Sequence, residues 1–497
     1  MSVHVNIIGA GLAGLSTGIF LEQKGIKTEI FEMAPWAGGM CTAWTRSGYR
    51  FDGCIHWMVG TRKGDPIYEL YLESGALDAA TKIYNAPSIK TEINGTMHDI
   101  PLEADAFHQF LTRSGEDDEA AIQAMMKDIK AMMKAELMLG PPNSLGQVIR
   151  FLIKGRGFMS IARKHGRKTV EQYRSNIHSD TVKQLIYRLM PPHFSAMALI
   201  MMLGTRMGGN AGYPLGGAQE VTRRMVEKYC ALGGKIHFNN KVDKIVVENG
   251  QSKGISVKGT YYPSDYVVAA CDAHDTLVNM LGGKYAHPQL DAMLKDAPLF
   301  EPLALVSFGL NKRFDIPFAI TYECPEGITT STSHKAYALS LRSFDFDSGA
   351  APGGASSIMA MFGAPQDYWV NLRALDLVEY KRQKQAMADD VANFLEKRIP
   401  GIKASIQVTD VSTPATYLRL TNVFKASYEG FEPVPRYLMN TIQKSLPGVS
   451  HLYLCGQWTT AGGGICTAIA DGKIIAKKIA KDNRNAWKGE TKGKNKG

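Results

Sequence analysis

A glycine-rich turn near the N-terminus constrains the fold of this chain more than any other feature. The segment VHVNII (residues 3–8) is typical of a short buried strand, and a GxGxxG pattern follows it directly and opens a helical sequence. Its glycines are Gly9, Gly11 and Gly14. Residues 27–31 predict a second strand, which Glu32 ends 18 residues beyond Gly14. This order of strand, turn, helix and strand predicts the dinucleotide-binding unit of a Rossmann-like α/β domain.

Each part of this unit has a physical role toward a dinucleotide. Gly9 makes the tight turn, Gly11 lets a pyrophosphate approach the backbone, and Gly14 lets the helix pack on the strand. The helix N-terminus supplies amide donors for the phosphates. Glu32 is placed to accept hydrogen bonds from a ribose, and it disfavours NADP because a 2′-phosphate would meet a carboxylate. The alternative, a glycine turn packed for its own sake, does not explain the terminal acid.

Further segments extend the pattern along the chain. Gly38, Gly39 and Met40 follow the acid, and YRFDG comes after a short polar turn at 49–53. YPLGG (213–217) precedes another helical segment, and the strand-like IHFNNKV ends at Val242. Near the C-terminus, LYLCG ends at Gly456 and AGGGI ends with Gly464 and Ile465, before a helix that we expect over 467–481.

With these segments the chain resembles the phytoene desaturase, carotenoid isomerase and retinol saturase group of flavoproteins, which are related more distantly to the flavin amine oxidases. The resemblance implies that the cofactor is FAD. It implies that the Gly38–Gly39 segment crosses the pyrophosphate and that Val242 reaches the adenine through its backbone. It also places Gly456, Gly464 and Ile465 along the ribityl chain and the flavin ring. Met40 departs from the pattern, because an arginine is usual there.

The same resemblance implies the reaction: desaturation, saturation or isomerisation of carbon–carbon double bonds in an apolar polyene, isoprenoid or lipid. Two alternatives stay open, namely an amine-oxidase-like enzyme for a small amine and a non-catalytic flavin- or lipid-binding protein. A cationic amine would prefer an acidic approach, whereas the insert between about residues 83 and 207 is basic and rich in methionine. No second GxGxxG follows a strand, so we expect a separate electron acceptor or donor.

Candidates for catalysis are few. His56 stands just past the segment expected beside the flavin, where an imidazole could move a substrate proton, but a structural histidine beside Trp57 is equally plausible. His193 is a weaker candidate of the same kind. The seven cysteines contain no CxxC pair, so we expect reduced thiols and no metal site. A redox pair of Cys41 and Cys54 is not expected, since their spacing matches no redox motif.

The order of these segments predicts two interleaved domains in an α/β fold. A Rossmann-like FAD-binding domain with a mostly parallel sheet is assembled from residues 1–82, 208–290 and 437–483. An inserted α+β substrate domain comprises 83–207 and 291–436, and the basic tail 484–497 is expected to be disordered.

The stretch 145–170 is unusual because basic and apolar residues alternate in it without any acid before residue 171. Such a mixture suits the surface of an anionic membrane, and a solvated basic helix pair is an equal alternative. Nucleic acid is not an expected partner, because no motif of a nucleic-acid-binding domain accompanies the basic residues. No signal peptide or membrane span is recognised, so we expect a cytoplasmic protein. A peripheral position at the inner face of the membrane is the second option.

Overall fold

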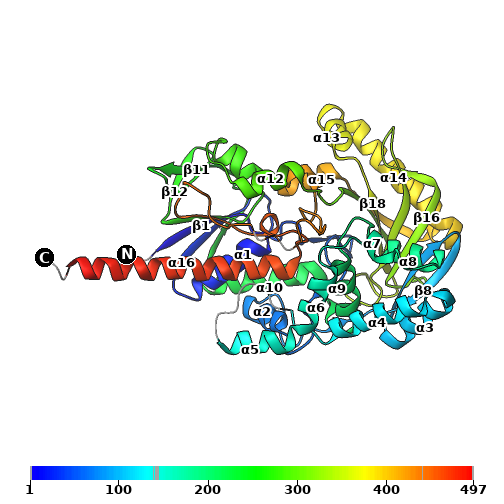
Figure 1. Ribbon diagram of the computed structural model, residues 1–497. Coiled ribbons are helices and arrows are strands. Elements are labelled where there is room, and N and C mark those ends of the chain that lie inside the picture. The colour runs from blue at the N-terminus through cyan, green and yellow to red at the C-terminus, as the bar shows by residue number, and fades with distance from the viewer. Residues whose placement is uncertain (1–2, 138, 140–144, 439, 441, 495–497) are drawn as a thin grey trace.

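The computed structural model describes residues 3–137, 139, 145–438, 440 and 442–494, without the side chains of 147 and 484–494. Two large sheets organise the chain, one parallel and one mixed (Figure 1). The α/β class and the Rossmann-like domain predicted from the sequence are confirmed. The exact domain boundaries stay predictions.

The first sheet has five parallel strands drawn from three distant parts of the chain, in the order β10-β2-β1-β14-β20. Its strands are β1 (His4–Ile8), β2 (Lys27–Phe31), β10 (Lys235–His237), β14 (Tyr266–Ala269) and β20 (Leu452–Leu454). The two N-terminal strands match the predicted ones. Because β1 lies between β2 and β14, and β14 pairs with β20, the turns that follow these strands meet at one edge of the sheet.

Helices from both ends and from the middle of the chain pack on this sheet. They are α1 (Leu12–Glu22), α10 (Gly217–Ala231) and α16 (Ile465–Lys494), which runs beside α1 in Figure 1. Ser16 Oγ donates to the Ile469 carbonyl at 2.7 Å, and a Cβ on Gly472 would lie 2.6 Å from Thr17 N. The glycine therefore lets α16 lie directly against α1.

The backbone of α16 is helical through Lys494, which corrects the expected end at 481 and the expected disorder of most of 484–497. Once a helix has nucleated, each further residue adds a hydrogen bond at little cost, so the helix continues although Gly489 and Gly493 are poor helix formers. Residues 495–497 lie outside the described part of the chain.

A small antiparallel sheet flanks the cofactor domain. It consists of β11 (Val242–Glu248), β12 (Gln251–Val257) and β13 (Thr260–Pro263). Its buried side chains share a core with Ile8, Phe31 and α12 (Pro288–Asp296). The start of β11 is thereby fixed beside the end of β2.

The second large sheet has seven strands in the order β19-β15-β18-β17-β16-β7-β8, paired antiparallel except for β16 with β7. They are β7 (Ser88–Ile93), β8 (Thr96–Pro101), β15 (Leu303–Leu310), β16 (Ala319–Thr329), β17 (Lys335–Ser343), β18 (Ser356–Gly363) and β19 (Ile406–Ser412). The helices α13 (Gln366–Leu375) and α14 (Leu377–Arg398) accompany it. This α+β part lies at the right of Figure 1.

A further group of helices comes from the segment between β8 and β9 (Ala211–Pro214). It comprises α3 (Ala104–Ser114), α4 (Glu119–Met133), α5 (Leu145–Lys154), α6 (Arg156–His165), α7 (Val170–Arg174), α8 (Asp180–Leu189) and α9 (Ala196–Met207). Of these, α3, α4, α5 and α6 lie along the lower side of Figure 1. Helix α9 is almost wholly buried and packs on α4, where Gly204 allows close contact with Met132. In the part of the chain that the structure describes, every helix is too short or too polar to cross a bilayer.

Candidate functional site

The N-terminal glycine turn has the geometry that a dinucleotide pyrophosphate requires. Gly9 has a φ of 98°, and its N–H donates to the Phe31 carbonyl at 2.8 Å. A Cβ on Gly14 would lie 2.0 Å from the Gly9 carbonyl oxygen, so only glycine lets α1 start this close to β1. Gly11 caps α1 without any side-chain hydrogen bond, which leaves the first amides of the helix available to a ligand.

Glu32 is fixed at the end of β2 by the backbone around it. Its carboxylate accepts from Ala10 N at 2.7 Å through one oxygen and from Ala34 N at 2.8 Å through the other. Burial raises the pKa of Glu32, while these N–H donors act in the opposite direction. Each oxygen keeps a further lone pair, so the carboxylate can still accept from ribose hydroxyls.

Two further predicted segments lie against this turn. The Gly38 N–H donates to the Ala10 carbonyl at 2.9 Å, and Gly38 and Gly39 both have positive φ, so the segment crosses close to Gly11. The backbone before Val242 lies beside Glu32, whose carbonyl accepts from Asn240 N at 2.8 Å. Sequence-distant residues expected to hold the pyrophosphate and the adenine are thus brought together.

Met40, which departs from the family pattern, occupies a largely apolar position. It packs against the core beside β11, and its sulfur accepts from Thr421 Oγ1 at 3.5 Å, at the end of α15 (Pro414–Thr421). A thioether can fill this space but offers a phosphate no charge. Contacts to a phosphate at this end of the site would therefore have to come from the backbone amides described above.

The C-terminal glycine turn meets the N-terminal one. Gly456 follows β20 with a φ of 105°, and a Cβ there would lie 3.2 Å from Ala13 Cβ. Its N–H donates to Asp471, whose buried carboxylate also binds Lys444 Nζ at 2.7 Å and Thr459 Oγ1. This network holds the turn after β20 against the start of α1.

Gly464 and Ile465 stand at the N-terminus of α16, after a turn in which Gly462, Gly463 and Gly464 all have positive φ. The free amides of this N-terminus form a second place where the backbone can donate to a ligand. Glycine turns at both ends of the chain can therefore hold one elongated cofactor.

Glu429 is a site residue that the sequence analysis missed. A Cβ on Gly463 would lie 2.7 Å from Glu429 Cγ, and one on Gly464 would lie 3.6 Å from Glu429 Oε1. Although partly accessible, the carboxyl is surrounded by protein, and burial raises its pKa to about 7. Within the described residues no hydrogen bond to this carboxyl is found. No motif surrounds it, so only the fold reveals the position.

Asp52 fixes the loop that leads to His56. One carboxylate oxygen accepts from Cys54 N and Ile55 N at 3.0 and 2.9 Å. The other accepts from Ala218 N and the Tyr213 hydroxyl, each at 2.8 Å. The carboxylate thus ties the loop to the first turn of α10.

Two cysteines meet at this loop, and a third, Cys466, lies in the first turn of α16. Cys54 lies in side-chain contact with Cys41, which the sequence spacing had not indicated. This contact, burial and neighbouring negative groups hold the pKa of Cys54 well above its usual range. Burial likewise raises the pKa of Cys466. Protonated thiols are weak nucleophiles, so the proximity does not make Cys54 a reactive thiolate.

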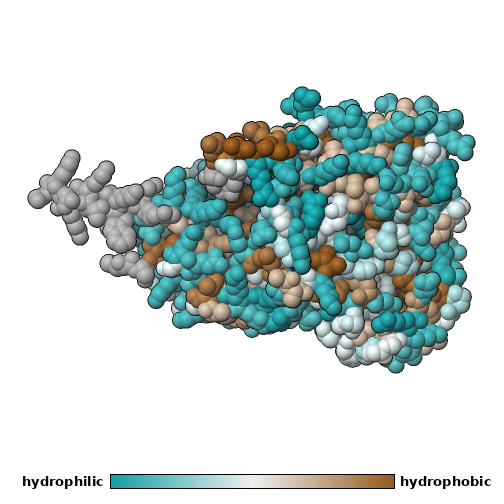
Figure 2. Space-filling model, turned by 90° about the horizontal axis from the view of Figure 1, so that it is seen from below, coloured by the Kyte–Doolittle hydropathy of each residue, from teal (hydrophilic) through white to brown (hydrophobic). Residues whose placement is uncertain are grey.

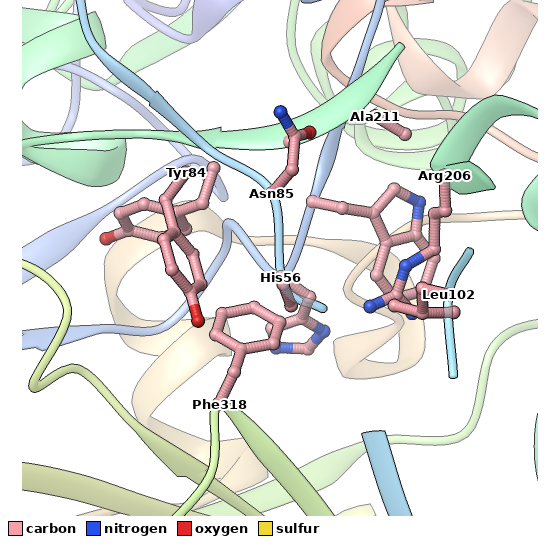
Figure 3. A pocket seen from close by; sticks show the side chains of 11 residues that line it. His56, Tyr84, Asn85, Leu102, Arg206, Ala211 and Phe318 are labelled. Atoms are coloured by element: carbon pink, nitrogen blue, oxygen red, sulfur yellow. The ribbon is translucent and has the colours of Figure 1, made fainter. Parts of the chain in front are cut away.

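His56 faces a small cavity of about 10 Å³ (Figure 3). The cavity is lined by His56, Trp57, Tyr84, Asn85, Ala86, Leu102, Arg206, Ala211, Gly212, Tyr213 and Phe318. Burial, Arg342 and Arg206 hold the pKa of His56 well below its usual range, so the imidazole is neutral. Its Nε2 is buried and has no partner among the described residues. His56 can therefore exchange a hydrogen bond with a ligand, but it is a poor carrier of positive charge.

Two buried arginines, also missed by the sequence analysis, stand beside His56. Arg206 of α9 lies 5.1 Å from the Trp57 ring centroid, and Arg342 of β17 lies 5.2 Å from that of Phe318. Burial lowers the pKa of Arg206 to about 10, and burial together with Arg206 lowers that of Arg342 to about 9. Both guanidinium groups nevertheless remain charged at neutral pH.

His193, the weaker catalytic candidate, is not part of the cavity. Its side chain is half exposed and bonds Glu432 at 2.8 Å. It therefore makes a hydrogen bond near the surface and is not part of the site around His56.

Comparison with known proteins gives one family. The model of flavin containing amine oxidoreductases matches residues 12–480. Phytoene desaturase (lycopene-forming) of Pseudescherichia vulneris is 24% identical, over 96% of this chain and 99% of that protein. Chloroplastic prolycopene isomerase of Daucus carota is 22% identical, over 96% of this chain and 80% of that protein.

Solved structures share the fold across the whole chain. An oxidoreductase from Methanosarcina mazei has a TM-score of 0.61 at 16% identity and covers 96% of this chain and 100% of its own. Cyclohexylamine oxidase from Brevibacterium oxydans has a TM-score of 0.56 at 14% identity, and the match covers 97% of this chain and 100% of that protein.

Proposed function

This chain belongs to the family of flavin-containing amine oxidoreductases, and from that membership we propose that it acts on carbon–carbon double bonds of an apolar polyene or isoprenoid. It is an FAD-dependent oxidoreductase. When bound, FAD supplies the redox chemistry by accepting or donating a hydride equivalent. The observation that carries the proposed substrate class is the full-length similarity to a phytoene desaturase and a prolycopene isomerase.

The residues around the two glycine turns would hold the cofactor. The amides at the start of α1 and the Gly38–Gly39 segment would hold the pyrophosphate, and Glu32 would accept from the ribose hydroxyls. The backbone at Val242 would meet the adenine. The amides at Gly464 and Ile465 would face the flavin end. Gly456 would allow close approach between these two regions.

The geometry also weighs against an amine-oxidase reaction. A small amine is protonated at neutral pH. Arg206 lines the cavity that holds His56, and the charge of Arg342 also acts on His56. Like charges in a buried site repel strongly, so an ammonium substrate would be excluded from this cavity.

An anaerobic comparison of polyenes with small amines tests this function. Purified holoprotein, started with oxidised and with reduced flavin, would be given each class while the flavin spectrum and the substrate chromatogram are recorded. The proposal expects conversion of a polyene from one starting state and no bleaching by amines. Bleaching of the oxidised flavin by an amine, with every polyene unchanged, would establish the amine-oxidase reaction instead.

Glu429 is suited to move the substrate proton. Its carboxyl lies against the Gly463–Gly464 turn, and its pKa of about 7 lets it exchange a proton near neutral pH. In desaturation the carboxylate would take the proton that the substrate loses, so the rate should rise as pH increases through 7. In saturation the protonated acid would be needed, and the rate should fall over the same range.

Glu429→Gln is expected to remove this pH dependence and to lower kcat by about 10²- to 10⁴-fold, the usual contribution of an acid–base group. The pH profile of kcat/KM measures both effects. Glu432→Gln is the matched control, because that carboxylate pairs with His193 near the surface. A Glu429→Gln enzyme that keeps the wild-type profile would show that the carboxyl does not transfer the proton.

A helix pair formed by α5 and α6 is proposed to dock on an anionic membrane. Five large apolar side chains of α5 are exposed, between 37% and 75%: Leu145, Val148, Ile149, Leu152 and Ile153. Figure 2 views the molecule from below, and a brown ridge stands at its upper edge, at the same horizontal position as α5 in Figure 1. Such a ridge can enter the apolar part of a bilayer.

The charges around this ridge complement anionic lipid. Arg150 bonds Glu136 and the Gly64 carbonyl, so it fastens α5 to the body of the protein. The exposed basic residues that follow form no ion pair within the described part of the chain: Lys154, Arg156, Arg163, Arg167 and Lys168. Each lysine or arginine near an anionic surface contributes about 1 kcal/mol of attraction.

Replacing Ile149, Leu152 and Ile153 together by serine is expected to weaken binding to phosphatidylserine-containing vesicles at least tenfold in a sedimentation assay, because it removes most of the apolar ridge. Leu375→Ser with Val378→Ser is the matched control, since these side chains are 86% and 81% exposed on another face. Neutral vesicles should bind the wild type weakly. Equal sedimentation of all variants with the vesicles would refute the docking surface. If the wild type instead forms dimers without vesicles, and the triple variant does not, the ridge contacts a second copy of the chain.

We also propose that electrons pass to or from a separate acceptor or donor, and that nucleic acid is not a partner. The first proposal is supported by the lack of a second GxGxxG after a strand. The second rests on the basic charge being mixed with an apolar ridge, which suits lipid better than phosphate backbone alone.

A further inference from the structure

We propose that Arg206, Arg342 and His56 form a subsite for an oxyanion, so that the substrate is an amphiphile: an unsaturated apolar chain that ends in a carboxylate or a phosphate. This inference rests on the proposed reaction at carbon–carbon double bonds and specifies the substrate class of that same site. It departs from a pure hydrocarbon substrate, which would leave these three groups without a polar partner.

The first support is that the two cations are buried without a counterion. Arg206 and Arg342 are 9% and 8% exposed, and neither forms an ion pair or a side-chain hydrogen bond with any described residue. Nε and Nη1 of Arg342 are completely buried and unpartnered. Burial of an unpaired charge is costly, and proteins normally pair such groups.

Arg50 is a buried arginine of the same fold whose charge is neutralised by a carboxylate. It is equally buried, at 8%, but its guanidinium pairs with Asp347 and reaches the Gly349 carbonyl. The chain therefore supplies a carboxylate where a buried arginine serves the structure. Beside His56 it supplies two cations and no acid, which indicates that an anion comes from a ligand.

The second support is the way in which the arginines are held. Trp57 lies by the Arg206 guanidinium and Phe318 by that of Arg342, and both aromatic residues line the cavity with His56. Contact with a ring face orients the planar guanidinium while it leaves the N–H groups at the edge free to donate. Arg206 lines the cavity, so its guanidinium edge can bind the oxygens of a carboxylate or phosphate. Arg342 does not line the cavity, and with Nε and Nη1 fully buried it would act on the head group through its charge.

His56 completes the set as a neutral donor or acceptor. Its buried Nε2 has no partner among the described residues, so it can add a hydrogen bond to the same head group. The side chains of Tyr84, Leu102 and Phe318 lie around His56 and Arg206 in Figure 3 and offer apolar surface to the chain behind the head group. Because a cavity of about 10 Å³ holds about one water molecule, these side chains would move apart when the substrate enters. A head group fixed in this way would set which double bond reaches the flavin.

The test uses the FAD-loaded enzyme and four polyenes that share one chain and differ in their end group: carboxylate, phosphate monoester, alcohol and hydrocarbon. Dissociation constants would be measured from the change in the flavin spectrum. The carboxylate or the phosphate is expected to bind on the order of 10²-fold more tightly than the alcohol, as for other buried charged contacts. The stronger of the two identifies the head group.

Arg206→Leu and Arg342→Leu are each expected to remove this preference while leaving the affinity for the alcohol within about threefold. Arg113→Leu is the matched control, since it removes one exposed arginine from α3. Flavin content and thermal stability report on folding. Because each leucine removes an uncompensated buried charge, the unliganded variants should melt no lower than the wild type.

Equal affinity of the wild type for all four end groups would overturn the subsite. So would a lowered melting temperature of both leucine variants with unchanged end-group preference, which would make the arginines structural. Conversion of the hydrocarbon alone would contradict the subsite but leave the proposed reaction intact. Conversion of no polyene, with amines bleaching the flavin, would instead refute the proposed reaction itself.

Discussion

Replacing Gly14 with alanine is expected to abolish FAD binding. The added Cβ would lie 2.0 Å from the Gly9 carbonyl oxygen, which is closer than non-bonded atoms can approach. The oxygen belongs to the backbone, and the Cβ is bonded directly to it. Neither can rotate away, so α1 must move from β1. That movement would displace the amides at the start of α1, which we propose donate to the cofactor phosphates.

Flavin content per protein after purification measures this effect, and thermal unfolding with and without added FAD shows whether the fold survives. Gly353→Ala is the control, because a Cβ at that loop position meets nothing within 4 Å. Strain from a forced backbone shift in a packed core typically costs about 1–3 kcal/mol or more, so the apoprotein should also be less stable. A Gly14→Ala protein with full flavin content would contradict the account of this turn.

Replacing Asp471 with leucine is expected to lower the free energy of unfolding by about 3–5 kcal/mol, the usual cost of removing one partner of a buried ion pair. The side chains of Asp471 and Lys444 are 5% and 13% exposed, and the carboxylate also accepts from the Gly456 N–H. The substitution therefore leaves a cation unpaired and releases the turn after β20. FAD binding should weaken as well, because that turn lies against Ala13.

Urea unfolding of the FAD-loaded protein measures the change, and a double variant separates charge from packing. Adding Lys444→Met to Asp471→Leu should recover most of the lost stability, since no unpaired charge is then buried. Asp105→Ala is the surface control: it removes an exposed pair with Lys130, and such pairs contribute about 0–1 kcal/mol. If Asp471→Leu lowers the free energy of unfolding no more than Asp105→Ala does, the hydrogen-bond network around Asp471 does not stabilise the turn after β20.

The cofactor domain could be predicted from the sequence because its signals are local. The glycines at 9, 11 and 14 must follow a strand and open a helix, and Glu32 must end the next strand, so adjacent residues define the unit. The later segments fit the same fold in order. The parallel sheet then brings them to one edge, as the structure confirms for its strands.

The catalytic surroundings could not be predicted in the same way, because they are made by tertiary contacts. Glu429 meets the Gly463–Gly464 turn across the fold, and Arg206 and Arg342 come from a buried helix and a strand of the mixed sheet. Nothing in their neighbouring residues distinguishes these charged side chains from surface ones. The contact between Cys41 and Cys54 was missed for the same reason, since spacing along the chain says little about a loop that folds back.

The mass of the product formed from a polyene tests the central claim most directly. Holoprotein would be incubated anaerobically with polyenes and unsaturated lipids, starting from oxidised and from pre-reduced flavin, and the products analysed by mass spectrometry. The account predicts one of three results: loss of two hydrogens for a desaturase, gain of two for a saturase, or unchanged mass with altered retention for an isomerase. If every polyene and lipid returned unaltered while a small amine was oxidised, the claim of chemistry at carbon–carbon double bonds would be contradicted.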